Sequence, residues 1–473
     1  MISFINALEW WQWALIDAVV IGCIGVLIPA VFLPSFKSPI QGVKYIVLLL
    51  PIYTTSNGLL LILNDKFDSA QVPIMVDLFA AITFAGLLLN WQSWALRTPR
   101  PITTGLLLFV IVSCLSCYNT ASWRRSAIAI IVFTQLALIT FCIESVVTNE
   151  ERVKMVWRWW YWSYLVVLFF GVVGIATVYL GIPNVANFNG VQVTSTFRFP
   201  NQLSLYLMIT AALMWPVATL RSTPKKVRRI VVWSMPVMLA VLWYSGSRSG
   251  AAGFIAAAAT LMVLTRHVRI LLVGALVCSA VGLVLIAYNI GSMGNFAKGS
   301  SRYAIIIAAL EGESTAQHSP FEFYETGANV AVDAFVEHPA VGGGIGAVLD
   351  FDTTPGQPYE VHNTFLGLAG QTGTLGLVIS LGIMLYAVRN AWRARAEARS
   401  PFLKAVANGC LAALVGFVIH GLANFDWRIR HVWLLFAFTS GVYIAARRSL
   451  RPVEQVAVTR TARVYPDIRV AAR

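Results

Sequence analysis

Residues 365–388 read FLGLAGQTGTLGLVISLGIMLYAV, a run without one charged side chain. A helix rises about 1.5 Å per residue, so a run of this length can cross the roughly 30 Å hydrocarbon core of a bilayer. Similar apolar runs recur along the whole chain and predict an all-α polytopic integral membrane protein. They cover residues 13–33, 45–63, 72–91, 102–120, 127–147, 164–180, 203–220, 230–244, 251–265, 270–290, 365–388, 405–422 and 432–446.

The composition excludes most soluble proteins. Of the 473 residues, 58% are hydrophobic and 12% are charged, whereas an ordinary soluble domain is roughly 45–50% apolar and about 25% charged. So few charges could not cover a globule of this size, which excludes a cytosolic enzyme, a disordered chain and a coiled coil. The run at 13–33 follows no basic residue and precedes no small-residue cleavage site. We therefore expect a retained helix there rather than a signal peptide.

The net charge of +14 is gathered beside the ends of apolar runs. Short basic links of this kind mark the cytoplasmic side of a membrane protein, so they favour the positive-inside pattern over a nucleic-acid partner. Residues 291–363 instead hold nine acidic side chains against Lys298 and Arg302, and we expect this segment outside. The basic links contain Lys225, Lys226, Arg228 and Arg229, then Arg389, Arg393, Arg395, Arg399 and Lys404, and finally Arg447, Arg448, Arg451, Arg460, Arg463 and Arg469.

Charge and hydropathy together divide the chain into four parts. We expect residues 1–290 to form the first transmembrane helices, 291–363 a large outer loop, 364–446 the last three transmembrane helices and 447–473 a basic cytoplasmic tail. The outer loop is far longer than the usual connection of about 4–6 residues, so it should carry function or fold as a small cap.

The number of crossings is open at this stage. Thirteen runs with the carboxyl terminus inside would put the amino terminus outside, and Arg124 and Arg125 would then lie on the outer face. If one early run does not span, about twelve crossings remain and both ends lie inside.

Within the outer loop, residues 304–310 and 328–336 are apolar at helical spacing, so we expect short helices lying on the outer face of the membrane. The glycine run at 342–346 is superficially like a phosphate cradle. It follows no predicted strand and lies outside the cytoplasm, so a nucleotide site is not expected.

Arginines are scarce on the outer side, and three stand beside small or helix-breaking residues: Arg198, Arg248 and Arg302. Each could snorkel or pair with a loop acid. Three on one face favour an anion site, because the planar guanidinium group binds phosphate oxygens in pairs.

His362 lies directly before the eleventh run and is followed by Asn363. We expect it in the first turn of that helix, where the positive end of the helix dipole disfavours the imidazolium ion. A neutral imidazole can act as a general base at neutral pH. Position alone favours this role no more than a structural one, in which His362 caps the helix or ties down the loop.

Several other polar residues interrupt or join the apolar runs. Asp17 and Asp77 lie inside runs, where an ionisable group is costly and is either functional or paired between helices. Asp426, Arg428 and Arg430 lie in the link between the last two runs and could contribute to the same outer site or to a second, acceptor-facing one. His420, inside a run, is expected to be a hydrogen-bonded packing residue. No histidine pair has metal-ligand spacing, and a single CxxC pair inside a run is a poor metal signal, so no metal site is expected.

The order of short motifs around the outer loop resembles the O-antigen ligase and polymerase superfamily of bacterial inner-membrane glycosyltransferases. These motifs lie at residues 198–201, 247–250, 300–302, 338–344 and 362–363. The ligases look most similar, because their pattern of His-Asn, nine residues and Gly-x-x-Gly is met by His362, Asn363, Gly373 and Gly376.

The resemblance implies a GT-C-like fold of about twelve transmembrane helices in the inner membrane, with a large periplasmic loop carrying short helices and an active site on the periplasmic side. It implies an inverting, metal-independent transfer of O-antigen from undecaprenyl diphosphate to a sugar hydroxyl of lipid A core, without a cofactor. Arg248 and Arg302, with Arg198 as a possible third partner, would then bind the diphosphate, and His362 would deprotonate the acceptor. Supporting roles would fall to Asn363, Asn201, Asp426 and Arg428.

Rival functions remain open. An O-antigen polymerase would use the same donor with a second lipid-linked glycan as acceptor, and a protein O-oligosaccharyltransferase would use a protein hydroxyl. A membrane transporter would show half-to-half symmetry and broken helices meeting at the middle of the bilayer. We see no internal repeat, and the polar residues cluster at one surface. The sequence indicates no oligomeric state.

Replacing Arg302 with Lys should lower glycan transfer nearly as far as replacing it with Ala, because a point charge cannot replace the paired donors of a guanidinium group. Transfer assays on membranes carrying each variant, at matched protein levels, measure the difference. Full activity of Arg302→Lys would contradict paired binding of the diphosphate by this residue.

Overall fold

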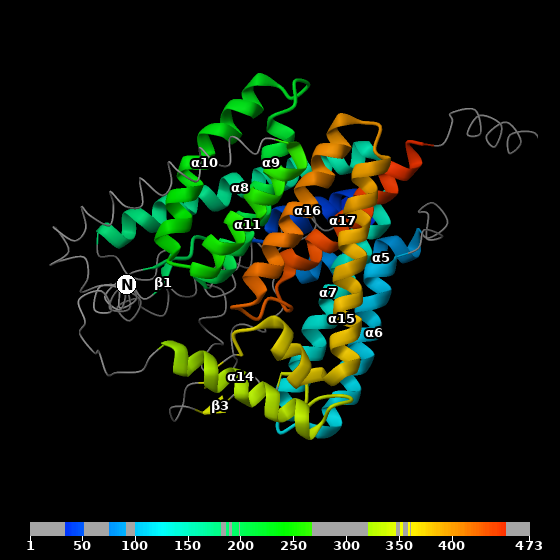
Figure 1. Ribbon diagram of the computed structural model, residues 1–473. Helices are drawn as coiled ribbons and strands as arrows, with labels where there is room; N and C mark the ends of the chain where they lie inside the picture. The colour runs from blue at the N-terminus through cyan, green and yellow to red at the C-terminus, as the bar shows by residue number, and fades with distance from the viewer. Residues whose placement is uncertain are drawn as a thin grey trace, which may run out of the picture.

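The computed structural model describes residues 34–51, 75–90, 100–180, 186–188, 192–197, 199–266, 320–346, 351–352, 358–359 and 361–450. Within these ranges the chain forms a bundle of packed helices with two short antiparallel strand pairs (Figure 1). The fold is therefore mainly helical, as the apolar runs predict.

The helices before residue 180 are α3 (Pro39–Leu49), α5 (Met75–Leu89), α6 (Pro101–Ser116), the 3-10 turn η1 (Cys117–Asn119), α7 (Trp123–Val146) and α8 (Glu150–Tyr179). Those after residue 199 are α9 (Pro200–Ala218), α10 (Lys225–Ser245), α11 (Arg248–Thr265), α14 (Pro320–Glu337), α15 (Thr364–Glu397), α16 (Pro401–Gly421) and α17 (Arg430–Arg448). The strand pairs are β1 (Asn187–Phe188) with β2 (Gln192–Val193) and β3 (Phe351–Asp352) with β4 (Pro358–Tyr359).

In the described part of the chain, seven helices are long and apolar enough to cross a membrane: α6 extended by η1, α7, α8, α10, α11, α15 and α16. These helices are compatible with an all-α, multi-pass membrane protein. The number of about twelve crossings stays a prediction, since the runs at 13–33 and 270–290 lie outside the described residues. Helices α9 and α17 have 19 residues each and are buried within the bundle along most of their length.

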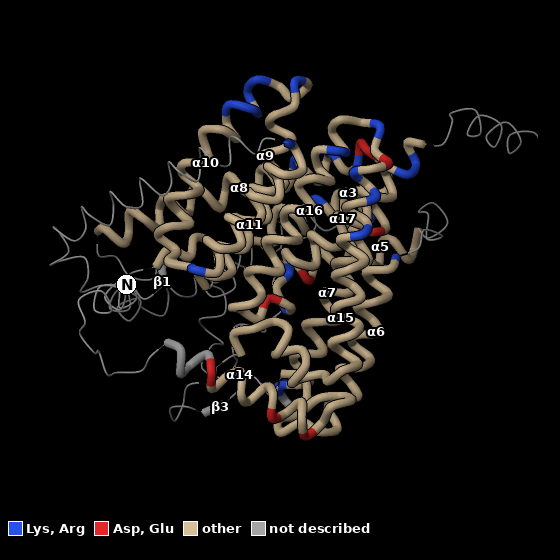
Figure 2. Tube along the Cα trace, viewed as in Figure 1, with Lys and Arg blue, Asp and Glu red and all other residues tan. Residues whose placement is uncertain are grey.

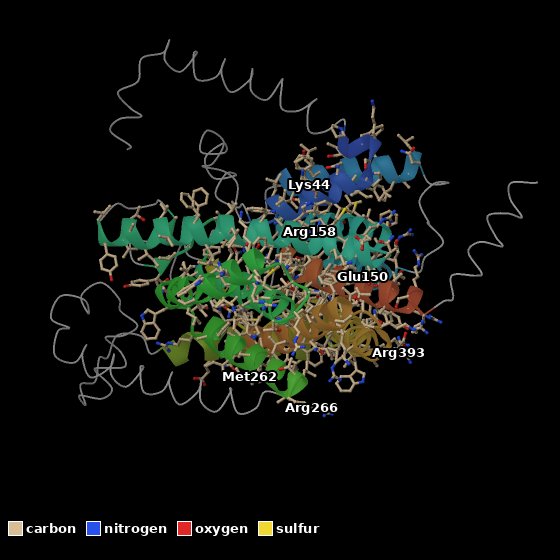
Figure 3. The ribbon with its side chains drawn as sticks, turned by 90° about the horizontal axis from the view of Figure 1, so that it is seen from above. Lys44, Glu150, Arg158, Met262, Arg266 and Arg393 are labelled. Carbon is tan, nitrogen blue, oxygen red and sulfur yellow. The ribbon has the colours of Figure 1, made fainter. Side chains whose placement is uncertain are left out.

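Lys and Arg gather at one end of the bundle, which we call the basic end (Figure 2). Here Arg228 donates hydrogen bonds to the carbonyl oxygens of Ala218 and Leu220, so α10 begins beside the last turn of α9. Figure 3 looks onto this end and shows Glu150, Arg266 and Arg393 around the bundle, on α8, beside α11 and on α15. Basic residues stand at the amino ends of α10 and α16 and at the carboxyl ends of α15 and α17, among them Lys225, Lys226, Arg228, Arg229, Arg389, Arg393, Arg395, Lys404, Arg447 and Arg448.

Helix α14 lies across the opposite end, which we call the α14 end (Figure 1). It includes the predicted helix at 328–336 and is longer at its amino end, while the other expected loop helix, at 304–310, lies outside the described residues. Gly370 of α15 allows α14 to approach α15 closely, because a Cβ added to Gly370 would lie 2.8 Å from the Ala331 carbonyl oxygen of α14. Helix α7 begins at this same end, since Arg125 contacts Gly346.

The glycine run at 342–346 fills a break in α15 and is not a phosphate cradle. Gly373 has φ 63° and ψ −164°, which interrupts the helix. The N–H groups of Gly343 and Gly344 donate to the carbonyl oxygens of Gly370 and Gln371, at 2.8 and 3.2 Å. Lipid offers no such partner, so the glycine run satisfies groups that the broken helix would leave unpaired. This packing explains why the Gly-x-x-Gly motif has a glycine at position 373, where φ is positive and the 340–341 backbone lies close.

One buried ion pair ties the first half of the chain to the last helix. Arg430 of α17 donates through Nε to Asp77 Oδ1 at 3.0 Å and through a terminal nitrogen to Asp77 Oδ2 at 2.7 Å. Both residues are almost completely buried. Asp77 therefore has the paired, structural role that the sequence left open, while Asp17 lies outside the described residues.

Replacing Arg430 with Met should lower the free energy of unfolding by about 3–5 kcal/mol, because Asp77 would keep a buried charge without its partner. The double change Asp77→Leu/Arg430→Met should recover most of this loss. Thermal unfolding in detergent micelles measures both. Arg447→Met, an exposed site on the same helix, is the matched control and should shift stability by less than about 0.5 kcal/mol. Equal losses at positions 430 and 447 would contradict the assigned role of the ion pair.

Candidate functional site

The amino ends of α9, α11 and α15 meet at the link between α16 and α17, and the sequence caps each of them locally. Pro200 begins α9, where a missing N–H group costs nothing. Ser247 caps α11 by accepting a hydrogen bond from the Gly250 N–H at 3.2 Å. Asn363 caps α15 by accepting from the N–H groups of Phe365 and Leu366, at 2.9 and 3.0 Å. Each of these three helix starts is therefore stabilised by residues of its own segment.

Asn424, in the link between α16 and α17, joins these three helix starts. Its side-chain oxygen accepts from the Asn201 amide of α9, and its side-chain nitrogen donates to the Ser249 hydroxyl of α11. Its main-chain carbonyl accepts from the Thr364 hydroxyl of α15 at 2.7 Å. One 5% exposed asparagine therefore sets how three separate helices approach one another.

A buried histidine and carboxylate lie next to Asn424. His420 Nδ1 is 2.6 Å from Asp426 Oδ2, and the two side chains are 0% and 1% exposed. The Asp426 N–H donates to the Thr364 hydroxyl at 2.9 Å. The expected hydrogen-bonded packing role of His420 agrees with this geometry, and its partner is one of the residues that the sequence placed at the outer site.

Serine hydroxyls continue the polar cluster between α9 and α11. Ser204 Oγ lies 3.4 Å from His420 Nε2 and 2.9 Å from Ser247 Oγ. Gly250 makes this contact possible, because a Cβ added there would lie 2.3 Å from the Ser204 Cβ. Low exposure of all these groups places them inside the protein, beneath the surface that the helix starts form.

His362 lies just outside the first turn of α15 and not within it. The helix begins at Thr364 with Asn363 as its cap, so His362 precedes the cap and is half-buried. The sequence placed it within the first turn because the apolar run began at residue 365, and the capping role of Asn363 was not recognised. The Asn363 amide also donates to the Leu422 carbonyl oxygen at 3.0 Å, which holds this end of α15 against the α16–α17 link.

Of the four arginines to which the resemblance assigns a role at the site, the structure describes Arg248 and Arg428. Arg248 is the exposed first residue of α11, and Arg428 is half-buried with its guanidinium carbon 5.4 Å from the centre of the Phe425 ring. Arg198 and Arg302 lie outside the described residues. The helix starts that carry Arg248 and His362 are joined through their neighbours, since Asn424 bonds both Ser249 and Thr364.

Sequence reasoning missed the residues that assemble this cluster: Ser204, Ser249, Thr364 and Asn424. Small polar side chains are common at the ends of helices, so none of these stood out in one sequence. A signal was present in the spacing of His420 and Asp426. An ionisable residue in the last turn of a buried helix, six positions before an acid in a short link, can fold back onto that acid.

The positive ends of the helix dipoles favour an anion at the starts of α9, α11 and α15, although the caps of α11 and α15 already accept from part of their N–H groups. Helix α14 itself is acidic, with Glu325, Asp333 and Glu337 exposed. The carboxylate of Asp426 points to His420 and is buried, so it adds little negative charge to the surface. Arg248 adds an exposed positive charge at the start of α11.

A comparison with protein families finds a match to the family described as O-antigen ligase, at residues 233–381. This range holds Arg248, Arg302, the glycine run at 342–346 and the His362-Asn363 pair. The match confirms the resemblance that the motifs indicated and supports membership of the O-antigen ligase and polymerase family. Asn201, His420 and Asp426 lie outside the matched range. No curated protein matches the chain.

Replacing Asn424 with Leu should lower the free energy of unfolding by about 1–3 kcal/mol or more, because the buried partners in Asn201 and Ser249 would lose their hydrogen bonds. Asn390→Leu is the matched contrast. Asn390 of α15 is buried, and neither of its amide atoms has a hydrogen-bond partner among the described residues, so this change should be neutral or stabilising. Thermal unfolding of both variants in detergent tests the difference, and equal effects would contradict it.

Proposed function

We propose, with membership of the O-antigen ligase and polymerase family as the premise, that this protein is an O-antigen ligase. It transfers O-antigen from undecaprenyl diphosphate to a sugar hydroxyl of lipid A core. One observation carries the proposal. The family match at residues 233–381 contains Arg248 and His362, and the helix starts beside these two residues are joined through Asn424.

The donor determines what the site must do. A glycan linked to a lipid diphosphate already has a good leaving group, so the enzyme has to hold the diphosphate and remove a proton from the acceptor hydroxyl. Groups that neutralise the departing diphosphate stabilise the transition state, where its negative charge grows. In this proposal Arg248 and Arg302 supply that charge, with Arg198 as a third partner.

His362 acts as the general base. His362 is half-buried and lies just before the start of α15. The cap of that helix is Asn363, so the capping role falls to the neighbour of His362, and in this proposal the imidazole takes the proton of the acceptor hydroxyl. Attack by the deprotonated hydroxyl opposite the diphosphate inverts the anomeric centre in one displacement.

The site belongs on the periplasmic face of the inner membrane. The positive-inside rule assigns the basic end to the cytoplasm, and α14 lies at the opposite end of the bundle (Figure 2). Helix α10 begins at the basic end, so the following start of α11 lies away from that end. The diphosphate group of a membrane-bound donor lies at that boundary, where a guanidinium group is partly shielded from water and binds anions more strongly than in bulk solvent.

Transport receives no support from the helix break in α15. A transporter uses broken helices that meet at a binding site near the bilayer midplane. The break at Gly373 is close to the α14 end and is filled by backbone, since the Thr374 N–H donates to the Pro339 carbonyl oxygen at 2.8 Å.

Replacing His362 with Ala should lower the rate of transfer about 10²–10⁴-fold, the usual contribution of a general base. The assay supplies purified enzyme with labelled donor and lipid A core. Thermal unfolding controls for folding, and normal transfer by a folded variant would contradict the base assignment. Product formed only with a second lipid-linked glycan, or only with a protein, would identify a polymerase or a protein O-oligosaccharyltransferase instead.

Replacing Arg248 with Lys should weaken donor use at least tenfold, because one ammonium cannot reproduce the paired contacts of a guanidinium group with a diphosphate. Arg266→Lys, at the other end of α11, is the matched control and should leave transfer unchanged. The ratio kcat/KM for the donor measures both variants. Equal values for Arg248→Lys and the unmodified protein would remove Arg248 from the diphosphate site.

A further inference from the structure

We propose that His420 is a positioning residue of the transfer reaction, and that it holds the Arg248-bearing and His362-bearing helix starts in register. This inference rests on the proposed function and deepens it. His420 is 0% exposed and lies in the last turn of α16, so it acts through other residues and does not touch substrate.

The two ring nitrogens of His420 face two different parts of the site. Nδ1 lies 2.6 Å from Asp426 Oδ2, and Nε2 lies 3.4 Å from Ser204 Oγ. An imidazole that is bonded on both sides has a fixed ring orientation, and the carboxylate selects which nitrogen carries the proton. The ring therefore sets the distance between Asp426 and Ser204.

On the carboxylate side, the contacts lead to His362. The Asp426 N–H donates to the Thr364 hydroxyl, which in turn donates to the Asn424 carbonyl oxygen. Gly421 leaves room for this approach, since a Cβ added there would lie 3.1 Å from Thr364 Oγ1. Thr364 is the first residue of α15, two positions after His362. The position of Asp426 thus determines the position of the start of α15 and, with it, that of His362.

On the serine side, the contacts lead to Arg248. Ser204 Oγ lies 2.9 Å from Ser247 Oγ, and Ser247 is the cap of α11, whose first residue is Arg248. Ser247 Oγ in turn lies 3.2 Å from Ser249 Oγ, which accepts from Asn424. His420 therefore lies between the two chains of hydrogen bonds that end beside the proposed base and the proposed anion-binding arginine.

His431 shows that burial alone does not require this arrangement. It is also 0% exposed, and neither of its ring nitrogens has a hydrogen-bond partner among the described residues. The rings of Phe197 and Tyr206 pack edge-on against it, each with its centroid 5.7 Å away. This bundle can bury an imidazole among aromatic rings, so the carboxylate partner of His420 serves a more specific purpose than filling space.

A small displacement in this cluster would reach the reacting groups directly. Misplacing a catalytic group by about 1 Å can cost on the order of 10²-fold in rate, because proximity and alignment supply much of the acceleration. Loss of the bond between His420 and Asp426 would loosen the α16–α17 link against the end of α16, and the start of α15 would move with the link through Thr364. Transfer should then slow in kcat, while affinity for the donor lipid changes little.

The test compares His420→Asn, His420→Gln and His431→Phe in the full-length protein. An Asn side chain can place its amide nitrogen where Nδ1 lies and keep the bond to Asp426, whereas Gln extends toward the Nε2 position. We expect His420→Gln to lower kcat about 10–100-fold with KM for the donor within about threefold, and His420→Asn to recover at least tenfold of that loss. His431→Phe should keep wild-type kcat and KM.

Amide hydrogen exchange gives a readout that does not depend on activity. In His420→Gln, the amides of residues 361–368 and 424–430 should exchange at least tenfold faster than in the unmodified protein. His420→Asn and His431→Phe should show little change, because the contacts of Asp426 persist in both. Thermal unfolding identifies any variant that loses its fold, and only folded variants are compared.

The outcomes separate the two proposals. Wild-type kcat and wild-type exchange in folded His420→Gln would overturn the positioning role and leave the ligase function standing. Faster exchange in a protein that transfers no glycan to any acceptor would overturn the ligase function and support the structural coupling. Equal slowing by His420→Gln and His431→Phe would overturn the positioning role too, since it would indicate a general effect of core substitutions.

Discussion

Lipid offers no hydrogen-bond partner, and the polar architecture of this bundle follows from that constraint. Among the described residues, several buried polar groups that break or join helices meet a partner inside the protein. The glycine run occupies the break in α15, Arg430 neutralises Asp77, and His420 binds Asp426. The Asp77–Arg430 pair joins distant parts of the chain and so also fixes how α5 and α17 pack, while the His420–Asp426 pair holds the α16–α17 link against the end of α16.

The candidate site uses the same constraint to bring functional residues together. Arg248 and His362 are carried on separate helices, each capped by its own neighbour. Asn424 and the His420–Asp426 pair connect those helix starts from beneath, while the outer surface keeps an exposed arginine and the positive ends of helix dipoles. A rigid buried layer supporting a polar surface suits a reaction whose main demands are orientation and charge stabilisation.

Local patterns predicted some features well and others poorly. The apolar runs gave the helical membrane class, and most observed helices begin or end within a few residues of a run. The helix at 328–336 was also predicted, although α14 begins earlier, at Pro320. His362 was placed inside the first turn of α15 but lies two residues before the helix, because the cap at Asn363 depends on a side-chain hydrogen bond that hydropathy does not report.

The sequence by itself determined the membrane class, the separation of charge between the two ends, and the residue types that suit an anionic lipid-linked donor. These depend on composition and short periodic patterns, which each segment carries alone. The tertiary structure decided which polar residues meet: that Asn424 joins three helices, that His420 pairs with Asp426 while His431 packs among rings, and that the glycines close a broken helix. The bonds of Asn424 join positions that lie far apart along the chain, and the His420–Asp426 pair forms only once the α16–α17 link folds back, so these partners become defined only when the helices pack.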